Sequence, residues 1–277
     1  MPLPGLWLLP PQIEGSWQFL LLGWLSATLI SLSKTGFGSS VGMLSVPLMI
    51  YACGGDAGLA VGIMLPLLIA GDYAAVISWR GHWRLRTVAM LLPGVAAGIA
   101  AGWGCVKALE QLGGENDLFV DAGMKLGIGL IALGFVTLRG FQALRGRLPA
   151  FRPIFWQASA AGTMMGFTST LAHAAGPVVA MYLLPQRMPK SRYVATTAML
   201  FWVVNQLKLL PFFELGWINT ATLGAGVFLL PGIAAGAVLG LFLHRRVGAR
   251  QFAGIVYSLL AALGVHLCIQ GARELWF

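Results

Sequence analysis

Residues 92–102 read LPGVAAGIAAG, and residues 230–240 read LPGIAAGAVLG. Seven of these eleven positions are identical, and the two stretches lie 138 positions apart. A second pair agrees with the first: GFGSSVGMLSVP at 36–47 and GFTSTLAHAAGP at 166–177 share Gly, Phe, Ser and Pro at an offset of 130. Internal similarity at a nearly constant separation indicates that the chain is a duplicated unit.

The composition is that of a membrane protein. Hydrophobic residues make up 58% of the 277 residues, charged residues only 10%, and the mean hydropathy is +0.80. Soluble domains carry roughly 25% charged residues, so lipid must cover most of this surface. The net charge of +9 does not indicate nucleic-acid binding, because the basic residues sit in short gaps between apolar runs and form no continuous basic face.

The apolar runs predict ten helical segments, since a spanning helix needs about 20 apolar residues. The segments are 15–33, 39–53, 57–79, 86–109, 118–138, 153–168, 170–185, 192–213, 218–243 and 252–271.

The charges between the segments predict a topology. Four gaps hold thirteen Lys and Arg and no acid, whereas the other gaps and ends hold eight Asp and Glu against three basic residues. Basic loops stay in the cytoplasm, which puts both termini outside and makes segment 86–109 run opposite to its copy 218–243. We therefore expect an all-α polytopic membrane protein with two inverted repeats of five segments, 1–140 and 153–277, joined by a basic cytoplasmic connector at 141–152.

Each half begins with two short segments joined by small and polar residues, SLSKTGFGSS at 31–40 and GFTSTLAHAAGP at 166–177. Irregular backbone is not tolerated in contact with lipid, so each stretch must reach water or be buried around a cavity. The hairpins either cross fully or turn back at mid-depth. We favour the second arrangement, with the two tips meeting near the midplane, because three of the four segments have only 15 to 16 residues.

Such tips predict an anion site. Helices that start near Ser39 and Thr170 would direct unpaired N–H groups and partial positive charge at the centre from opposite sides. The alternative is that the Gly and Ser residues only allow close helix packing. The candidate substrate-binding residues are Lys34, Gly36, Phe37, Gly38, Ser39, Ser40, Gly166, Ser169, Thr170, His173, Gly176, Asn205 and Lys208.

Three ionisable residues remain within or beside the apolar segments: Lys34, Asp72 and Lys208. Charges inside membrane helices are costly and usually functional. We expect Lys208 to attract the anion and Asp72 to couple transport to protons or to gate the path. Asn205 shares a helical face with Lys208 and can hydrogen-bond an oxyanion. Two alternatives stay open for Asp72, a direct ion pair with Lys208 and a structural hydrogen bond to a neighbouring helix end.

The chain resembles the TauE/SafE family of sulfite exporters and anion permeases. The resemblance rests on GFG at 36–38, MLPLLIAGD at 64–72, the stretch that follows Gly166 up to Leu184, and TTAMLFWVVNQLKLLPF at 196–212. It covers nearly the whole chain. It implies a multi-pass carrier of the bacterial inner membrane that moves sulfite, sulfoacetate, related organosulfonates or carboxylates.

The predicted function is secondary transport of a small oxyanion by alternating access. The chain contains no GxxxxGK[ST] motif, which would indicate ATP binding, so the energy for transport would come from a gradient. The expected partners are the anion, the lipid bilayer and a coupling proton or sodium ion; we expect no nucleic acid, no metal and no other cofactor. Three alternatives remain: a channel, a membrane scaffold or partner subunit without transport, and an intramembrane enzyme that uses Ser169 or Thr170 with His173. The last lacks an acidic residue nearby in sequence to orient the histidine.

Overall fold

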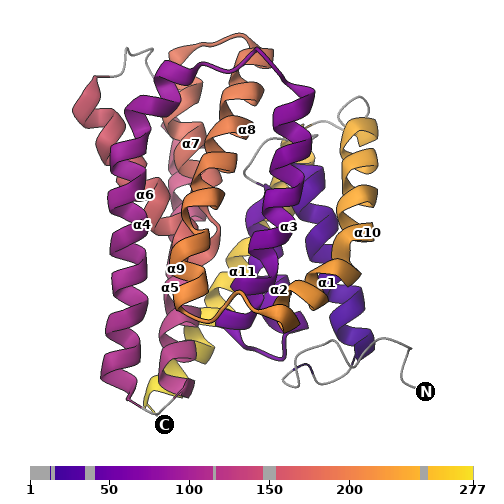
Figure 1. Ribbon diagram of the computed structural model, residues 1–277, viewed down its shortest axis with the longest axis vertical. Helices are drawn as coiled ribbons and strands as arrows, with labels where there is room; N and C mark the ends of the chain where they lie inside the picture. Colours follow the sequence, from indigo (N-terminus) through magenta and orange to yellow (C-terminus); the bar gives the residue numbers. More distant parts are fainter. Residues whose placement is uncertain are drawn as a thin grey trace.

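The computed structural model describes residues 13, 16–34, 41–114, 117–145, 154–243 and 249–276. Over these residues the chain forms α-helices and short 3-10 helices and no strand (Figure 1). In chain order they are α1 (Ser16–Leu32), η3 (Val41–Leu44), α2 (Ser45–Ala52), α3 (Ala57–Ser78), α4 (Leu85–Gly113), α5 (Asp117–Arg145), α6 (Phe155–Ala172), α7 (Ala175–Leu183), η4 (Leu184–Gln186), α8 (Lys190–Leu207), α9 (Leu209–Glu214), α10 (Thr220–Leu243) and α11 (Ala249–Trp276). The predicted all-helical fold class is confirmed.

The helix boundaries differ from the predicted ones at two instructive places. The predicted segment 192–213 is interrupted at Lys208, between α8 and α9. Pro211 has no N–H to donate to the carbonyl of Leu207, and this weakens the helix at that turn. In the first half, α5 continues to Arg145, so the beginning of the expected connector is helical.

Two hairpins, α1–α2 and α6–α7, begin the two halves. Their second helices have eight and nine residues, too few to cross a bilayer. The predicted helix start near Thr170 is wrong, because α6 continues to Ala172 and α7 begins at Ala175. Proline is tolerated in the first turn of a helix but not in its interior, and a start at Ala175 makes Pro177 the third residue. Pro47 is likewise the third residue of α2.

The repeated LPG helices pack against the first helix of each hairpin, in both cases through glycine. In α4, a Cβ at Gly98 would lie 2.1 Å from the carbonyl oxygen of Thr163 on α6. In α10, a Cβ at Gly236 would lie 2.3 Å from the carbonyl oxygen of Thr28 on α1. These distances are shorter than any van der Waals contact, so only glycine permits such close backbone approach. The LPG helix of each half, α4 or α10, thus packs on the hairpin of the other half.

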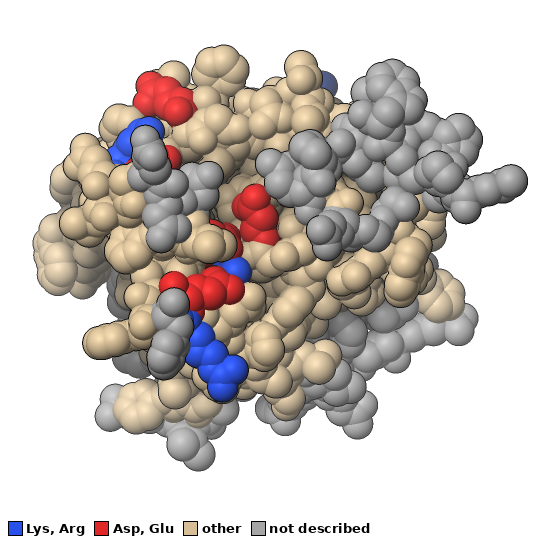
Figure 2. Space-filling model, turned by 90° about the horizontal axis from the view of Figure 1, so that it is seen from below, with Lys and Arg blue, Asp and Glu red and all other residues tan. Residues whose placement is uncertain are grey.

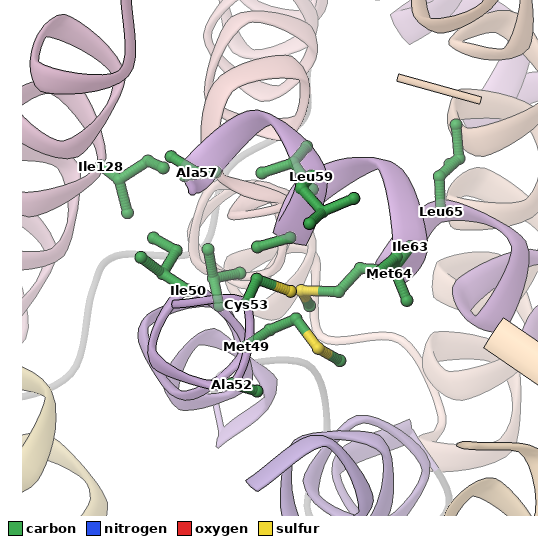
Figure 3. Packing of buried hydrophobic residues seen from close by; sticks show 14 of the residues in the cluster. Met49, Ile50, Ala52, Cys53, Ala57, Leu59, Ile63, Met64, Leu65 and Ile128 are labelled. Atoms are coloured by element: carbon green, nitrogen blue, oxygen red, sulfur yellow. The ribbon is translucent and has the colours of Figure 1, made fainter. Parts of the chain in front are cut away.

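Two further pairs join the halves: α3 packs against α8, and α5 packs against α11. The largest buried apolar cluster includes residues of α1, α2 and α3 and also of α5, α10 and α11. In its part between the first hairpin and α3, Met49 of α2 and the following Cys53 lie close to Met64 of α3 (Figure 3). This dense packing fixes the first hairpin against the middle of α3.

Among the residues that the structure describes, five helical stretches are long and apolar enough to cross a membrane: Ala57–Ser78, Leu85–Gly113, Leu118–Leu138, Ser191–Glu214 and Thr220–Gly240. They support the assignment of the chain as a multi-pass membrane protein.

Charge is divided between the two ends of the molecule. The α3–α4 and α7–α8 connections, with Arg80, Arg84 and Arg187, lie at the upper end in Figure 1. The lower face carries acidic side chains with a few Lys and Arg side chains among them (Figure 2). A wide depression there, of about 680 Å³, is lined by acidic residues that include Glu110 and Glu274.

Candidate functional site

In the first hairpin, a lysine directly after the first helix reaches α3. Directly after α1, the Nζ of Lys34 donates a hydrogen bond to the carbonyl oxygen of Leu68 at 2.9 Å and forms an ion pair with the carboxylate of Asp72. The side chain of Lys34 is 12% exposed and that of Asp72 only 1%. The Oγ of Ser33 accepts a hydrogen bond from the N–H of Gly42 at 3.0 Å, which ties the two sides of the tip together.

Asp72 connects side chains from the two halves of the chain. One carboxylate oxygen accepts from Lys34, and the other accepts a hydrogen bond from the Nδ2 of Asn205 on α8 at 2.6 Å. Both oxygens of this buried carboxylate therefore have a donor, as a charge removed from water requires. Among the described residues, its ion-pair partner is Lys34 and not Lys208.

The second hairpin turns at a histidine. His173 ends α6 in the left-handed conformation, with φ of 46°, a region that histidine enters more readily than most residues. One ring nitrogen, Nε2, lies 2.9 Å from the carbonyl oxygen of Val61 on α3, and Nδ1 lies 2.7 Å from the Nζ of Lys208. A carbonyl only accepts and an ammonium only donates, so these contacts fit a neutral imidazole with its proton on Nε2.

Lys208 is completely buried and lies behind the second tip. Its Nζ contacts the carbonyl oxygen of Ser169 at 3.1 Å and His173 at 2.7 Å. It also lies 5.4 Å from the centre of the Phe212 ring, within the range of a cation–π interaction. These contacts direct the ammonium at the hairpin backbone, which explains why it does not pair directly with Asp72.

A small cavity of about 40 Å³ lies between the two tips. A single water needs about 10–15 Å³ measured in this way, so the space fits a few waters or one small ion. Its wall comes from both hairpins and from the paired helices α3 and α8. The lining residues are Ile30, Ser33, Lys34, Gly42, Ser45, Met64, Leu68, Ser169, His173, Ala175, Gly176, Phe201 and Asn205.

Five of the residues proposed from sequence line this cavity together: Lys34, Ser169, His173, Gly176 and Asn205. Asp72 and Lys208 each contact a lining residue from outside it. Gly36, Phe37, Gly38, Ser39 and Ser40 lie outside the described residues.

Gly166 and Thr170 are placed elsewhere, at the contact between α6 and α4. The Oγ1 of Thr170 donates to the carbonyl of Gly166 at 2.9 Å. A Cβ on Gly166 would lie 2.3 Å from the carbonyl oxygen of Val95. Their positions favour the packing interpretation for these two residues.

Sequence reasoning did not select Ser33 and Ser45. The Oγ of Ser45 donates to the carbonyl oxygen of Gly42 at 2.5 Å, and the Oγ of Ser26 donates to the carbonyl oxygen of Ser45 at 2.8 Å. Two sequence features could have indicated their place at the cavity: Ser33 lies next to Lys34, and Ser45 lies two residues before Pro47.

An all-helical chain with five membrane-length helices and charged side chains around a cavity between two hairpins defines a multi-pass membrane protein. The family profile described as "Sulfite exporter TauE/SafE" matches residues 23–267. The protein therefore belongs to the TauE/SafE family of sulfite exporters, which confirms the family suggested by the sequence motifs. Comparisons with curated proteins and with solved structures gave no match.

Proposed function

We propose that this protein is a secondary transporter of small oxyanions, in particular sulfur-containing ones such as sulfite, sulfoacetate or another organosulfonate. The observation that carries the proposal is the cavity lined by both hairpin tips, with Lys34, His173 and Asn205 on its wall. The first turn of α7 also lines it through Ala175 and Gly176, and a helix N-terminus attracts anions.

The transport cycle we propose is alternating access between two inverted repeats. The supporting feature is reciprocal packing: α4 lies against α6 and α10 against α1, while α3 pairs with α8 and α5 with α11. Each pair joins a helix of one half to a helix of the other, as expected when two similar halves interlock around a central site. We propose that the glycine-packed pairs α1–α10 and α4–α6 move as units.

We propose that the protein lies in the bacterial inner membrane. The end of the molecule that is uppermost in Figure 1 then faces the cytoplasm. The support is the arginines of the α3–α4 and α7–α8 connections, because basic loops stay on the cytoplasmic side. Both termini then face the outside, as α1 begins and α11 ends at the lower end (Figure 1).

Asp72 is the residue we propose for coupling or gating. The carboxylate contacts Lys34 on the first hairpin and Asn205 on α8, so its protonation would weaken the interactions with both side chains. Asp72→Asn should remove any transport driven by a pH gradient while anion exchange continues. Uptake that still responds fully to a pH gradient in Asp72→Asn would contradict the coupling role.

The test of the function is counterflow in proteoliposomes with sulfite, sulfate, sulfoacetate, taurine and small carboxylates. Exchange of at least one anion, lost in Lys34→Gln, is the expected result. Lys107→Gln is the matched control, because Lys107 is 37% exposed and forms an ion pair with Glu110 away from the cavity. If folded wild-type protein exchanges no anion of the panel, the scaffold alternative replaces the transporter.

The geometry disfavours the enzyme alternative. Both ring nitrogens of His173 already have partners, Val61 and Lys208, so in this arrangement the ring cannot act as the base that a serine nucleophile needs. Ser169 contacts Lys208 through its backbone carbonyl, which Ser169→Ala keeps. Anion exchange within about tenfold of wild type is therefore expected for Ser169→Ala, whereas loss of a nucleophile abolishes covalent catalysis.

A further inference from the structure

The elements that line the cavity carry few charges. Apart from Lys190 and Arg192 at the start of α8, the sequences of α1, α2, α3, α6, α7, α8 and the turns between the helices of each hairpin contain only Lys34 and Asp72 as Lys, Arg, Asp or Glu. Residues 35–40, which lie outside the described residues, read TGFGSS and include no Lys, Arg, His, Asp or Glu. Lys208, at the end of α8, completes the set.

The pair formed by Lys208 and His173 can hold at most one positive charge. Nζ and Nδ1 are 2.7 Å apart, a distance that requires one proton between a donor and an acceptor. The two groups therefore cannot both be cations: the pair carries one positive charge when Lys208 is an ammonium and none when it is a neutral amine. The neighbouring groups, the carbonyls of Ser169 and Val61, only accept hydrogen bonds and contribute no formal charge.

The largest charge that the cluster can hold is therefore two positive charges and one negative charge, with Lys208 protonated. Lys34 is matched by Asp72, at ion-pair distance, while the charge on Lys208 and His173 has no carboxylate partner among the described residues. Burial of an unmatched charge is unfavourable. An anion in the cavity would supply the missing charge, because His173 both lines the cavity and contacts Lys208.

We propose that the transported species is a monovalent oxyanion, matched to the single net positive charge that the Lys34, Asp72, Lys208 and His173 cluster can hold. This inference rests on the proposed transport function and adds the charge of the substrate to it. A singly charged ion makes the occupied site neutral, whereas a dianion leaves one excess negative charge in a region of low dielectric. The volume of about 40 Å³ restricts the ion to a compact one.

Methanesulfonate and sulfate are the probes for this inference. Both are tetrahedral at sulfur and similar in size, and they differ by one negative charge. In proteoliposomes without a membrane potential, wild-type protein should exchange methanesulfonate at least about tenfold faster than sulfate, because the excess charge of the dianion is costly when buried. Sulfate exchange equal to or faster than methanesulfonate exchange would overturn the proposal.

Charge variants make the test independent of shape. Asp72→Asn raises the net charge of the cluster to two, so the ratio of sulfate to methanesulfonate exchange should rise by about tenfold. Lys107→Gln, which removes a positive charge away from the cavity, should keep the wild-type ratio. An unchanged ratio in Asp72→Asn overturns the proposal, and the wild-type comparison decides the question if a variant does not fold.

Failure of this inference is distinguishable from failure of the transport function. If wild-type protein exchanges sulfite or another anion of the panel but does not favour the monovalent probe, only the charge assignment is wrong. If folded wild-type protein exchanges none of the anions, the transport function itself is contradicted and the charge assignment falls with it.

Discussion

A lysine lies at each hairpin tip, the mostly buried Lys34 at the first and the fully buried Lys208 at the second, and the two ammonium groups have different partners. At the first tip, Lys34 faces the carboxylate of Asp72. At the second tip, Lys208 faces the carbonyl of Ser169, the ring nitrogen of His173 and the face of Phe212. The first lysine is half of an ion pair, whereas the second is held by neutral groups. Removal of the charge should therefore lower the stability much more at the first position than at the second.

The largest effect on stability is expected at the first tip. Lys34→Met leaves Asp72 buried without a counter-charge, and removal of one partner of a buried pair costs about 3–5 kcal/mol. Chemical denaturation of the purified protein in detergent micelles measures the loss. Lys107→Met is the control, because its ion pair with Glu110 is about one-third exposed and such pairs contribute about 1 kcal/mol or less. Equal losses in the two variants would show that the Lys34–Asp72 pair does not stabilise the fold.

A double variant sharpens this result. Lys34→Met/Asp72→Leu removes both charges, so its loss of stability should be smaller than the sum of the two single losses, with a coupling of about 2 kcal/mol. Transport should stay lost in the double variant, since Lys34 lines the cavity. Additive losses would indicate that the two side chains act independently.

An intermediate effect is expected where the LPG helices hold the hairpins. Gly98→Ala on α4 and Gly236→Ala on α10 each place a methyl group against a carbonyl of the adjoining hairpin helix, and overpacking of this kind costs about 1–3 kcal/mol. Gly104 lies on α4 with nothing within 4 Å of its Cβ position. Gly104→Ala should therefore be neutral or stabilising by up to about 1 kcal/mol. Thermal unfolding of the three variants compares the two hairpins directly.

Similar losses at Gly98 and Gly236 would show that both hairpins depend equally on their LPG helix. A large loss at one glycine and none at the other would contradict the reciprocal arrangement that supports the inverted repeats.

Much of the fold could be predicted from the sequence because lipid imposes simple constraints. The apolar runs and the charged gaps between them predict helices whose bounds differ by a few residues from those observed. The buried charges were also recognisable, since Lys34, Asp72 and Lys208 stand out in apolar surroundings. Their pairing could not be predicted, because estimates of depth along single helices do not say which way a lysine side chain turns. Lys208 turns toward His173, 35 residues away in sequence.

The roles of the small polar residues were harder to separate. Ser, Thr and Gly suit both a polar tip and close helix packing, so composition alone could not place Thr170 at the α4–α6 contact or Ser45 at the cavity. For Thr170, the observed position of the turn at His173 and Ala174 distinguishes the two roles.

The smallest effect on stability, and a large one on function, is expected for Lys208→Met. The substitution leaves the Nδ1 of His173 without its donor, at a cost of about 1–3 kcal/mol. It also removes a buried charge that no carboxylate matches, and replacement of buried charges by apolar groups of similar volume is often neutral or stabilising. The two contributions oppose each other, so the unfolding free energy should change by about 1 kcal/mol or less. Anion exchange should nevertheless be lost, because the cluster then carries no net positive charge. A loss of stability as large as that of Lys34→Met would mean that Lys208 holds the second hairpin in place, and the contrast between the two tips would no longer stand.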